Sequence, residues 1–381
     1  MRILFWSELA WPHIGGVELL THKLMIALRE RGHSLALITS HADLTLPDER
    51  TEDGILVRRF AMQEAISQQR LDAVARINRQ IKSFKRTFRP NIIHVNFPSP
   101  SILLHWMTDF EVTAPTLLSI HHTLSDFPAG PETLIGRSLA RASWIVANSA
   151  FTSNEALHAN PKIADRCSVI YNGIDSPVRP SVDLPWNPPR VVCLGRMTRN
   201  KGFDIALRAF AEAHRFVPDS RMTIAGNGPE LEGLMALADN LEIRDTVDFP
   251  GWVAPETVGV LMASATLVVV PSIVRESFGL VAIEAMQYAR PVIAAASGAL
   301  AELVFHQETG LVVPPGDVTA LAKAFERLLS NRGLAAQMGA AGYHRALAHF
   351  GFARCVNEYE SLYAQLHAAQ EGVSHARPGL D

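Results

Sequence analysis

The sequence of 381 residues has few cysteines and no long apolar run, and both absences narrow the class of protein. Its three cysteines, Cys167, Cys193 and Cys355, are far apart and match neither a disulfide framework nor a zinc site. Buried, reduced thiols in a cytoplasmic protein are the simplest explanation. No stretch of about eighteen apolar residues occurs, so no transmembrane helix is expected. The apolar run that starts at Met1 breaks at Ser7, too early for a signal peptide.

The chain also lacks a large net charge and a pair of acidic residues placed to bind a metal. The formal net charge is −3 at pH 7, which gives no overall attraction to nucleic acid. No Asp-x-Asp pair follows an expected strand, so we expect no bound metal. Apolar residues, in contrast, make up 48% of the chain, which is enough for well-buried sheets.

Short apolar runs alternate with helical patterns along the whole chain. Continuous apolar strands separated by helices indicate parallel β-sheets covered on both faces, an α/β fold. A chain of this length fits two such domains better than one. The expected strands include 2–6, 34–39, 92–95, 116–120, 143–147 and 167–170, then 190–194, 221–225, 246–249, 266–270 and 291–295.

A proline-rich stretch separates the two sets of strands. Residues 176–189 contain five prolines in fourteen positions and no periodicity, which is typical of a linker. We therefore expect a doubly wound, Rossmann-like domain over 1–178 and another over 179–350. Ligands of such sheets bind at the carboxyl ends of the strands, so we expect the two domains to face each other across a cleft.

Two glutamates eight positions apart, Glu276 and Glu284, follow the buried run 265–271. Eight residues is a little over two helical turns, so both carboxylates can point the same way, with Glu276 at the mouth of a helix. Free N–H groups of a first turn suit phosphate, and the carboxylates suit hydroxyls; a nucleotide sugar carries both. A chance pair of solvated glutamates is the plain alternative. The N–H groups expected in that turn belong to Ser277, Phe278, Gly279 and Leu280.

A strand that ends in Gly195 is followed by Arg196 and Lys201. A glycine lets a ligand approach the backbone closely, and the two cations can neutralise a leaving diphosphate without a metal. Taken alone, two exposed cations on a surface loop would explain this segment. Taken together, the Gly-Arg…Lys-Gly segment and the two spaced glutamates resemble the retaining glycosyltransferases of family 4, which have the GT-B fold.

The resemblance covers nearly the whole chain and implies an activity. Such enzymes transfer a sugar from a nucleotide diphosphate to an acceptor hydroxyl, keep the anomeric configuration and need no metal or other cofactor. It implies that Arg196 and Lys201 stabilise the leaving diphosphate. Glu284 is expected to bind the ribose and Glu276 the donor sugar. A UDP-sugar is expected ahead of a GDP-sugar, although relatives hold the base chiefly through backbone groups.

The resemblance also assigns the two domains. The second domain is expected to hold the donor and the first the acceptor, which is a glycan, a lipid-linked sugar of the cell envelope or a small molecule. A last helix over about 351–370 is expected to cross back and pack on the first domain. Its apolar stripe consists of Phe352, Val356, Tyr359, Leu362, Tyr363 and Leu366.

Further positions match the family. Gly15 and Gly16 form a loop that is expected to approach the donor phosphates, and His121 ends a strand close to the donor sugar. Many members follow this histidine with Asp, whereas this chain has His122, so the role of that Asp is open and Asp126 is only a weak substitute. Asn148-Ser149 and Asn172-Gly-Ile-Asp175 also match, the first as a cleft contact and the second as a hinge turn. Nucleotide contacts are expected at Gly195, Gly226, Asn227, Gly228 and Trp252.

A basic segment over 58–90 has nine Lys or Arg and two acidic residues, a local charge of +7. Its apolar residues fall on one helical face. A core-packed helix with a solvated basic face is the plain interpretation. Docking at the inner face of the membrane on anionic lipid, or steering of an anionic acceptor, is the sharper one. The basic residues expected off the apolar face are Arg76, Arg79, Lys82, Lys85, Arg86 and Arg89.

Two other functions stay open. A nucleotide-sugar epimerase can use the same fold, but it needs a carboxylate acid/base pair in addition. A non-catalytic nucleotide-sugar-binding protein is disfavoured, because the residues expected to bind the diphosphate and the sugar are all present.

Overall fold

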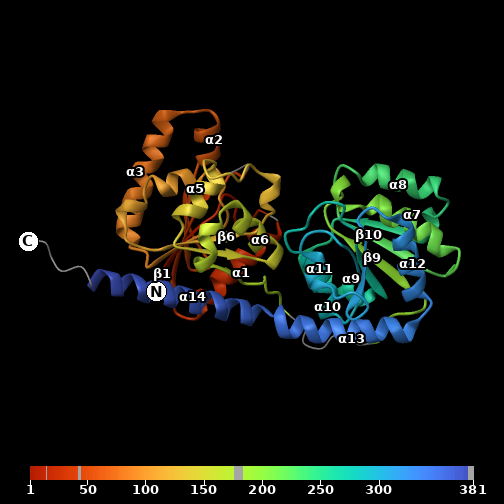
Figure 1. Cartoon of the computed structure of the whole chain (residues 1–381). Helices are drawn as coiled ribbons and strands as arrows, with labels where there is room; N and C mark the ends of the chain where they lie inside the picture. The colour runs from red at the N-terminus through yellow and green to blue at the C-terminus, as the bar shows by residue number, and fades with distance from the viewer. Residues whose placement is uncertain (14, 42–43, 176–182, 376–381) are drawn as a thin grey trace, which may run out of the picture. The chain divides into compact units, whose positions relative to one another are not determined.

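The computed structural model describes residues 1–13, 15–41, 44–175 and 183–375. The chain forms two compact units, Met1–Gly173 with Ala353–Asp381, and Ile174–Phe352. Each unit contains one sheet of mainly parallel strands with helices packed against it (Figure 1). This confirms the expected α/β fold class. The expected boundary at residue 178 and positions 176–182 of the expected linker lie outside the described residues.

The sheet of the first unit has eight strands in the order β3-β4-β2-β1-β5-β6-β7-β8. Its neighbours pair in parallel except β3 with β4, which are antiparallel. The strands are β1 (Arg2–Trp6), β2 (Ser34–Ser40), β3 (Glu49–Glu52), β4 (Ile55–Phe60), β5 (Ile92–Val95), β6 (Thr116–Ile120), β7 (Trp144–Ala147) and β8 (Cys167–Val169).

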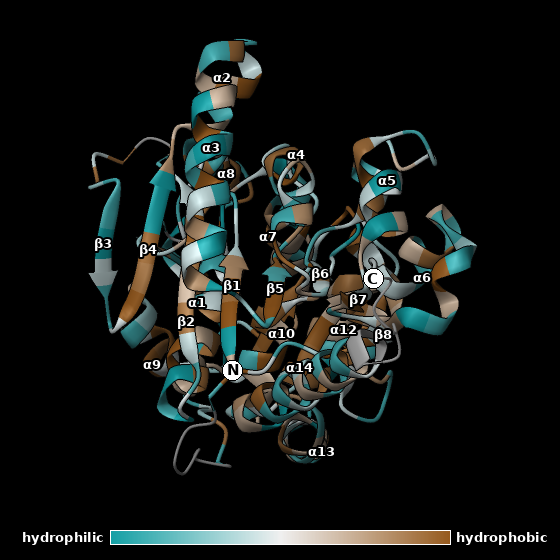
Figure 2. Ribbon diagram, turned by 90° about the vertical axis from the view of Figure 1, so that its left-hand side faces the viewer, coloured by the Kyte–Doolittle hydropathy of each residue, from teal (hydrophilic) through white to brown (hydrophobic). Residues whose placement is uncertain are grey.

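The edge strand β3 and its neighbour β4 were not among the expected strands, and their composition explains why. Figure 2 shows β3 in hydrophilic colours and β4 changing from hydrophobic to hydrophilic along its length. Strand β3 reads Glu-Arg-Thr-Glu, and β4 carries Arg58 and Arg59 near its end. Such sequences lack the continuous apolar run of a strand buried on both faces. Polar strands at a sheet edge also discourage pairing with another chain.

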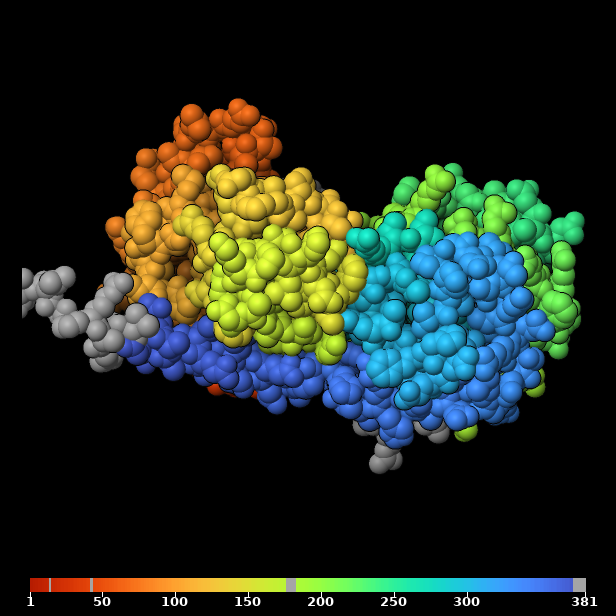
Figure 3. All heavy atoms as spheres, in the orientation of Figure 1, coloured from red at the N-terminus to blue at the C-terminus, as the bar shows by residue number. Residues whose placement is uncertain are grey.

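The helices of the first unit include the last helix of the chain. They are α1 (Gly16–Glu30), α2 (Met62–Ser67), α3 (Leu71–Phe88), α4 (Ile102–Trp106), α5 (Leu134–Arg141), α6 (Ala150–Ala159) and α14 (Phe352–His375). Helix α2 and the adjoining part of α3 stand out from the body of this unit (Figures 1 and 3).

Helix α14 packs on the first unit through a buried polar network. The hydroxyl of Tyr363 lies 2.6 Å from Nδ1 of His94, and Nε2 of His94 lies 2.7 Å from Oγ of Ser119. The hydroxyl of Tyr359 lies 3.3 Å from the same Oγ. Buried polar groups that satisfy one another in this way fix one arrangement of the packed elements. Of the predicted apolar stripe, Val356, Tyr359, Leu362 and Tyr363 are buried, and Phe352 and Leu366 are half-buried.

The basic segment is wider than one helix. It begins in β4 and continues through α2 and α3. Helix α3 buries Ile77, Ile81 and Phe84 on one face, as its pattern predicts. The prediction for Lys85 is wrong: its side chain is completely buried instead of solvated. Nζ of Lys85 reaches neutral acceptors on α4 and the turn after it, which the spacing along one helix cannot reveal.

The second unit contains a sheet of six parallel strands in the order β11-β10-β9-β12-β13-β14. The strands are β9 (Arg190–Leu194), β10 (Arg221–Ala225), β11 (Val247–Gly251), β12 (Leu267–Val270), β13 (Val292–Ala295) and β14 (Gly310–Val313). The helices are α7 (Phe203–His214), α8 (Leu231–Asn240), α9 (Pro255–Ser264), α10 (Leu280–Gln287), α11 (Leu300–Leu303), α12 (Val318–Leu329) and α13 (Arg332–His349).

The expectation of buried, reduced cysteines is met in part. All three are free thiols; Cys193 and Cys355 are buried, and Cys167 is only half-buried. None of the described helices combines the length and the apolar character that crossing a membrane requires.

Candidate active site

The loops that carry the predicted donor-binding residues meet at one edge of the second unit's sheet. All six strands are parallel, so their carboxyl ends lie along the same edge. The loop after β9 carries Arg196 and Lys201, and its neighbours after β10 and β12 carry Gly226 and Glu276. Trp252 follows β11 and is exposed. The topology therefore brings these predicted residues to a common edge.

Backbone contacts hold three of these loops together. The N–H of Gly195 donates to the carbonyl of Ala225 at 3.0 Å. The N–H of Gly226 donates to the carbonyl of Gly251 at 2.7 Å. A Cβ on Gly226 would overlap the carbonyl oxygen of Gly195, so no other residue fits there without a backbone shift. Glycine at this position therefore has a structural reason beyond access for a ligand.

Glycine and asparagine in the next positions continue this packing. The N–H of Met197 donates to the carbonyl of Asn227 at 2.8 Å, and a Cβ on Gly228 would overlap the carbonyl oxygen of Met197. The two loops therefore support each other and fix where the chain leaves β9. Arg196 extends from this junction as an exposed side chain, with no hydrogen bond or ion pair to another described residue.

Lys201 and Glu276, both predicted site residues, are in direct contact. Nζ of Lys201 lies 2.6 Å from Oε1 of Glu276, and the hydroxyl of Ser272 donates to the same oxygen at 2.5 Å. Ser272 is buried, whereas the lysine and glutamate side chains are partly exposed. Ser272 was not among the predicted site residues. The sequence marks it only as a hydroxyl residue directly after the proline that ends the apolar run 265–271.

The helix near Glu276 begins later than predicted. Helix α10 starts at Leu280, after Gly279 with φ of +113°. Glu276 lies in an extended segment, where its carbonyl accepts from the N–H of Ala299 at 2.8 Å and it bridges to Gly298. Glu284 lies inside the helix as expected, but the predicted start directly after Glu276 is wrong, because the helix begins at Leu280. The isolated bridge to Gly298 holds Glu276 outside the helix, which begins after Gly279.

This later start also places three of the four predicted first-turn residues before the helix, with Gly279 as its N-cap. Ser277 and Phe278 precede the helix instead of opening it. Phe278 is buried, and its ring packs edge-on against Phe350 at 6.1 Å. Its side chain is therefore part of the core of the second unit.

The predicted residues of the first unit lie at the corresponding edge of its sheet. His121 follows β6 and is buried, and its Nδ1 has no hydrogen-bond partner among the described residues. Burial, helped by the neighbouring His122, lowers the pKa of His121 to about 3. The imidazole is therefore neutral at physiological pH and can offer one N–H donor and one acceptor nitrogen.

The residues around His121 already have structural partners. The exposed His122 packs edge-on against Phe97 at 5.0 Å. The carboxylate of Asp126 accepts a hydrogen bond from the hydroxyl of Thr123. Ser149 caps α6 through a reciprocal capping box, so this serine serves the helix.

The loop before α1 brings a carboxylate to the predicted phosphate position. Gly15 is the N-cap of α1, and Gly16 is its first residue. A Cβ on Gly15 would overlap the carboxylate of Glu18, which therefore lies against this glycine. An acidic side chain in the first turn stabilises the helix by the same interaction with free N–H groups that a phosphate would use.

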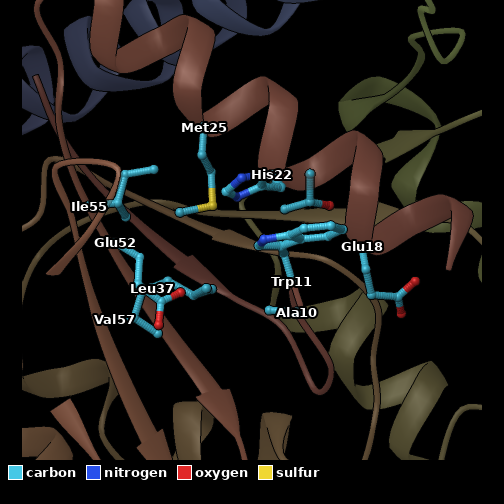
Figure 4. Close-up of a pocket in the computed structure, with 10 residues that line it drawn as sticks. Ala10, Trp11, Glu18, His22, Met25, Leu37, Glu52, Ile55 and Val57 are labelled. Carbon is cyan, nitrogen blue, oxygen red and sulfur yellow. The ribbon is translucent and has the colours of Figure 1, made fainter. Parts of the chain in front are cut away.

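A small pocket in the first unit lies beside this loop, between α1 and strands β2 and β4 (Figure 4). The Trp11 ring stacks on the imidazole of His22, with centroids 5.5 Å apart and an interplanar angle of 19°. Burial lowers the pKa of His22, although Asp53 and Glu52 oppose the shift. No sequence motif marks this pocket, because its walls come from segments far apart in the chain. Its lining consists of Ala10, Trp11, Glu18, Thr21, His22, Met25, Leu37, Glu52, Ile55 and Val57.

Two parallel-sheet α/β units with this edge architecture define a GT-B-type protein. Models of two families match the chain: Glycosyltransferase Family 4 over 14–176 and Glycosyl transferases group 1 over 177–345. The chain belongs to glycosyltransferase family 4, as its motifs predict.

Relatives of known name agree with this assignment. A GDP-mannose-dependent alpha-(1-6)-phosphatidylinositol monomannoside mannosyltransferase of Mycolicibacterium smegmatis is 38% identical over 42% of this chain and 43% of its own length. The match therefore spans less than half of that relative. A glycogen synthase of Mycobacterium tuberculosis is 27% identical and aligns over 100% of this chain and 98% of its own.

Solved structures give the same fold. A sucrose-phosphate synthase of Thermosynechococcus elongatus superimposes with a TM-score of 0.80 at 26% identity, covering 97% of this chain and 99% of that one. The HepE protein of Anabaena, solved with UDP, superimposes with a TM-score of 0.79 at 24% identity, covering 96% and 100%.

Proposed function

We propose that this chain is a metal-independent, retaining glycosyltransferase that moves a sugar from a nucleotide diphosphate to an acceptor hydroxyl. The observation that carries the proposal is the meeting of Lys201 and Glu276 at 2.6 Å on the carboxyl edge of the second sheet, in a chain of this family. One side chain suits phosphate, and the other suits hydroxyls. Relatives named as glycosyltransferases support the same activity.

In this proposal the cations act where charge develops during the reaction. Arg196 and Lys201 stabilise the diphosphate as it leaves, and these fixed charges take the place of a metal ion. Glu284 binds the ribose hydroxyls, and Glu276 binds hydroxyls of the donor sugar. The leaving phosphate accepts the acceptor proton, so no protein base is required. The neutral His121 fits a hydrogen-bonding role better than a role as base, because its pKa is about 3.

The donor base is part of the proposal. We expect a UDP-sugar, and the Anabaena neighbour solved with UDP is in keeping with this. Two of the related mannosyltransferases, from Mycolicibacterium smegmatis and Mycobacterium tuberculosis, are named as GDP-mannose-dependent, so GDP-mannose is the principal alternative. Backbone groups near Gly226 and Trp252 would contact the base, which is why side-chain identity does not decide between them.

The acceptor is proposed to bind the first unit and to be a glycan, a lipid-linked sugar of the cell envelope or a small molecule. A relative that acts on phosphatidylinositol monomannoside supports a lipid-linked acceptor. We further propose a cytoplasmic enzyme that contacts anionic lipid at the inner membrane face through α3, where Arg76 and Arg79 are exposed and have no partner among the described residues.

A panel of UDP- and GDP-sugars tests the activity. Thermal shift identifies the donor, and mass spectrometry of reactions with candidate acceptors identifies the product. Proton NMR of that product reports the anomeric configuration, which should match the donor. Transfer should persist in excess chelator. Inversion, or activity that chelator abolishes and manganese restores, contradicts the corresponding part of the proposal.

Two other outcomes favour other functions. A new isomer of the nucleotide sugar, formed without any acceptor, indicates an epimerase. Tight donor binding with no transfer to any acceptor indicates a binding protein.

A further inference from the structure

Lys201 and Glu276 neutralise each other in the structure, although the proposed function gives each of them a different part of the donor. Oε1 of Glu276 accepts two hydrogen bonds, one from Nζ of Lys201 at 2.6 Å and one from Oγ of Ser272 at 2.5 Å. Oε2 has no hydrogen-bond or ion-pair partner among the described residues. One oxygen is therefore committed to the protein, and the other remains available.

The backbone holds this pair in place from both sides. The N–H of Ile273, next to Ser272, donates to the carbonyl of Asn200, next to Lys201, at 3.0 Å. The carbonyl of Glu276 is fixed by the N–H of Ala299. Ser272 is 1% exposed, so its hydroxyl has little freedom to find water instead. The two loops that carry the lysine and the glutamate are thus tied to each other.

We propose that Glu276 is a counter-ion that competes with phosphate for Lys201, and that only an intact sugar donor overcomes this competition. The inference rests on the proposed function. A bare nucleoside diphosphate must bring negative charge to a lysine that is already paired, and it meets a carboxylate 2.6 Å from that lysine. An intact donor brings hydroxyls that donate to Oε2, which stabilises the carboxylate while the phosphate engages the lysine.

This arrangement makes the site selective between its substrate and its product. The donor sugar supplies the hydroxyls, and the nucleoside diphosphate that remains after transfer does not. The product therefore loses the contact that offset the charge repulsion, which promotes its release. Ser272 is a positioning residue here, because its hydroxyl holds Oε1 toward the lysine and leaves Oε2 for the ligand.

Calorimetric titration of UDP and of GDP, without metal ions, into the full-length protein tests the inference. Glu276→Gln and Glu276→Ala should each bind the preferred diphosphate about tenfold more tightly than wild type, because Lys201 loses its competitor. Both should use the intact donor less well, with kcat/KM lower by roughly tenfold or more. Asp248→Asn removes an exposed carboxylate that pairs with Arg190 in the same sheet, and its diphosphate affinity should stay at the wild-type value.

A double-mutant cycle with Lys201→Met separates this inference from the proposed function. Loss of the lysine should weaken diphosphate binding more in the Glu276→Gln background than in wild type. If Lys201→Met weakens binding but Glu276→Gln and Glu276→Ala leave it equal or weaker, the counter-ion role is wrong and the diphosphate clamp stands. If Lys201→Met changes binding in neither background, or no diphosphate binds any variant, the proposed function fails and the inference with it.

Discussion

Two lysines that look alike in the sequence have opposite surroundings in the two units. Lys201, in the loop after β9, is partly exposed and paired with one carboxylate. Lys85, on α3, is completely buried, and its Nζ contacts the neutral Nδ1 of His105 at 3.0 Å and the hydroxyl of Thr108 at 2.9 Å. The first can exchange its partner for a phosphate. The second cannot reach solvent, so its charge serves no ligand.

Most other cations of the basic segment over 58–90 are also not available to a ligand, because acidic side chains pair with them. Its charge of +7 counts residues, but acidic side chains from outside the segment pair with much of it. Glu49 pairs with Arg58, and Glu52 pairs with Arg59 at 2.9 Å. Glu111 pairs with Lys82 at 3.4 Å and with Arg86 at 2.7 Å. A local excess of charge therefore indicates a ligand site only after its partners have been subtracted.

The strongest test of this contrast removes the exposed cations of the second unit. Arg196→Ala or Lys201→Ala should each reduce turnover by about two to three orders of magnitude, as loss of a transition-state charge contact does. Circular dichroism should show an unchanged fold, since neither side chain is in the core. Near-normal turnover in both variants would remove the distinction between the two lysines.

A second test concerns Glu284, which the proposal assigns to the ribose. Glu284→Ala should weaken binding of the bare nucleoside diphosphate roughly 10- to 100-fold, because a hydrogen bond to a charged group is lost. This is the opposite direction from the change expected for Glu276→Ala. Titration of UDP and GDP into both variants measures the difference. Equal effects on the two glutamates would show that their roles are not divided as proposed.

Much of the fold and the outline of the site could be predicted from the sequence. The buried strands are continuous apolar runs, and the motif residues follow them directly, so parallel pairing places these residues at one edge. Other features depend on contacts between distant segments. The burial of Lys85 depends on α4, and the late start of α10 depends on the bridge from Glu276 to Gly298. Neither contact leaves a pattern in the local sequence.

The pH dependence of stability tests the first unit's lysine. Burial lowers the pKa of Lys85 from 10.5 to about 7, although Asp109 and Glu111 oppose the shift. Between these two values the unfolded chain binds the proton more tightly than the folded one, so the free energy of unfolding should rise with pH. From pH 7.5 to 9 the rise from this group should be about 2 kcal/mol, and below pH 7 it should vanish.

Urea unfolding followed by tryptophan fluorescence measures this rise, since Nζ of Lys85 lies 5.8 Å from the centroid of the Trp6 ring. Lys85→Met keeps the volume and removes the titrating group, so its unfolding free energy should rise about 2 kcal/mol less over the same range. Lys162→Met, at an exposed site of the same unit, is the matched control and should follow wild type. Parallel curves for wild type and Lys85→Met would show that the buried lysine does not titrate as inferred.

The last test concerns cations of the first unit that have no acidic partner in the described part of the chain. Lys82 and Arg86 are poor choices for charge reversal, because each would then face the carboxylate of Glu111. Arg76 and Arg79 are exposed and have no partner among the described residues. Each basic side chain near an anionic bilayer contributes about 1 kcal/mol, so Arg76→Glu with Arg79→Glu should weaken binding to anionic vesicles by at least roughly 30-fold at low salt.

Co-sedimentation with vesicles of neutral or anionic lipid, at low and high salt, measures this binding. We expect binding to the anionic vesicles alone, and less of it at high salt because exposed charges are screened. Arg208→Glu with Arg215→Glu makes the same charge change at exposed positions of the second unit and should bind as wild type does. A wild-type protein that binds both lipids equally, or neither, would leave α3 with a solvated basic face and no membrane role. The contrast would then be complete: Lys201 could exchange its carboxylate partner for a ligand, whereas the charge of α3 would only keep the protein soluble.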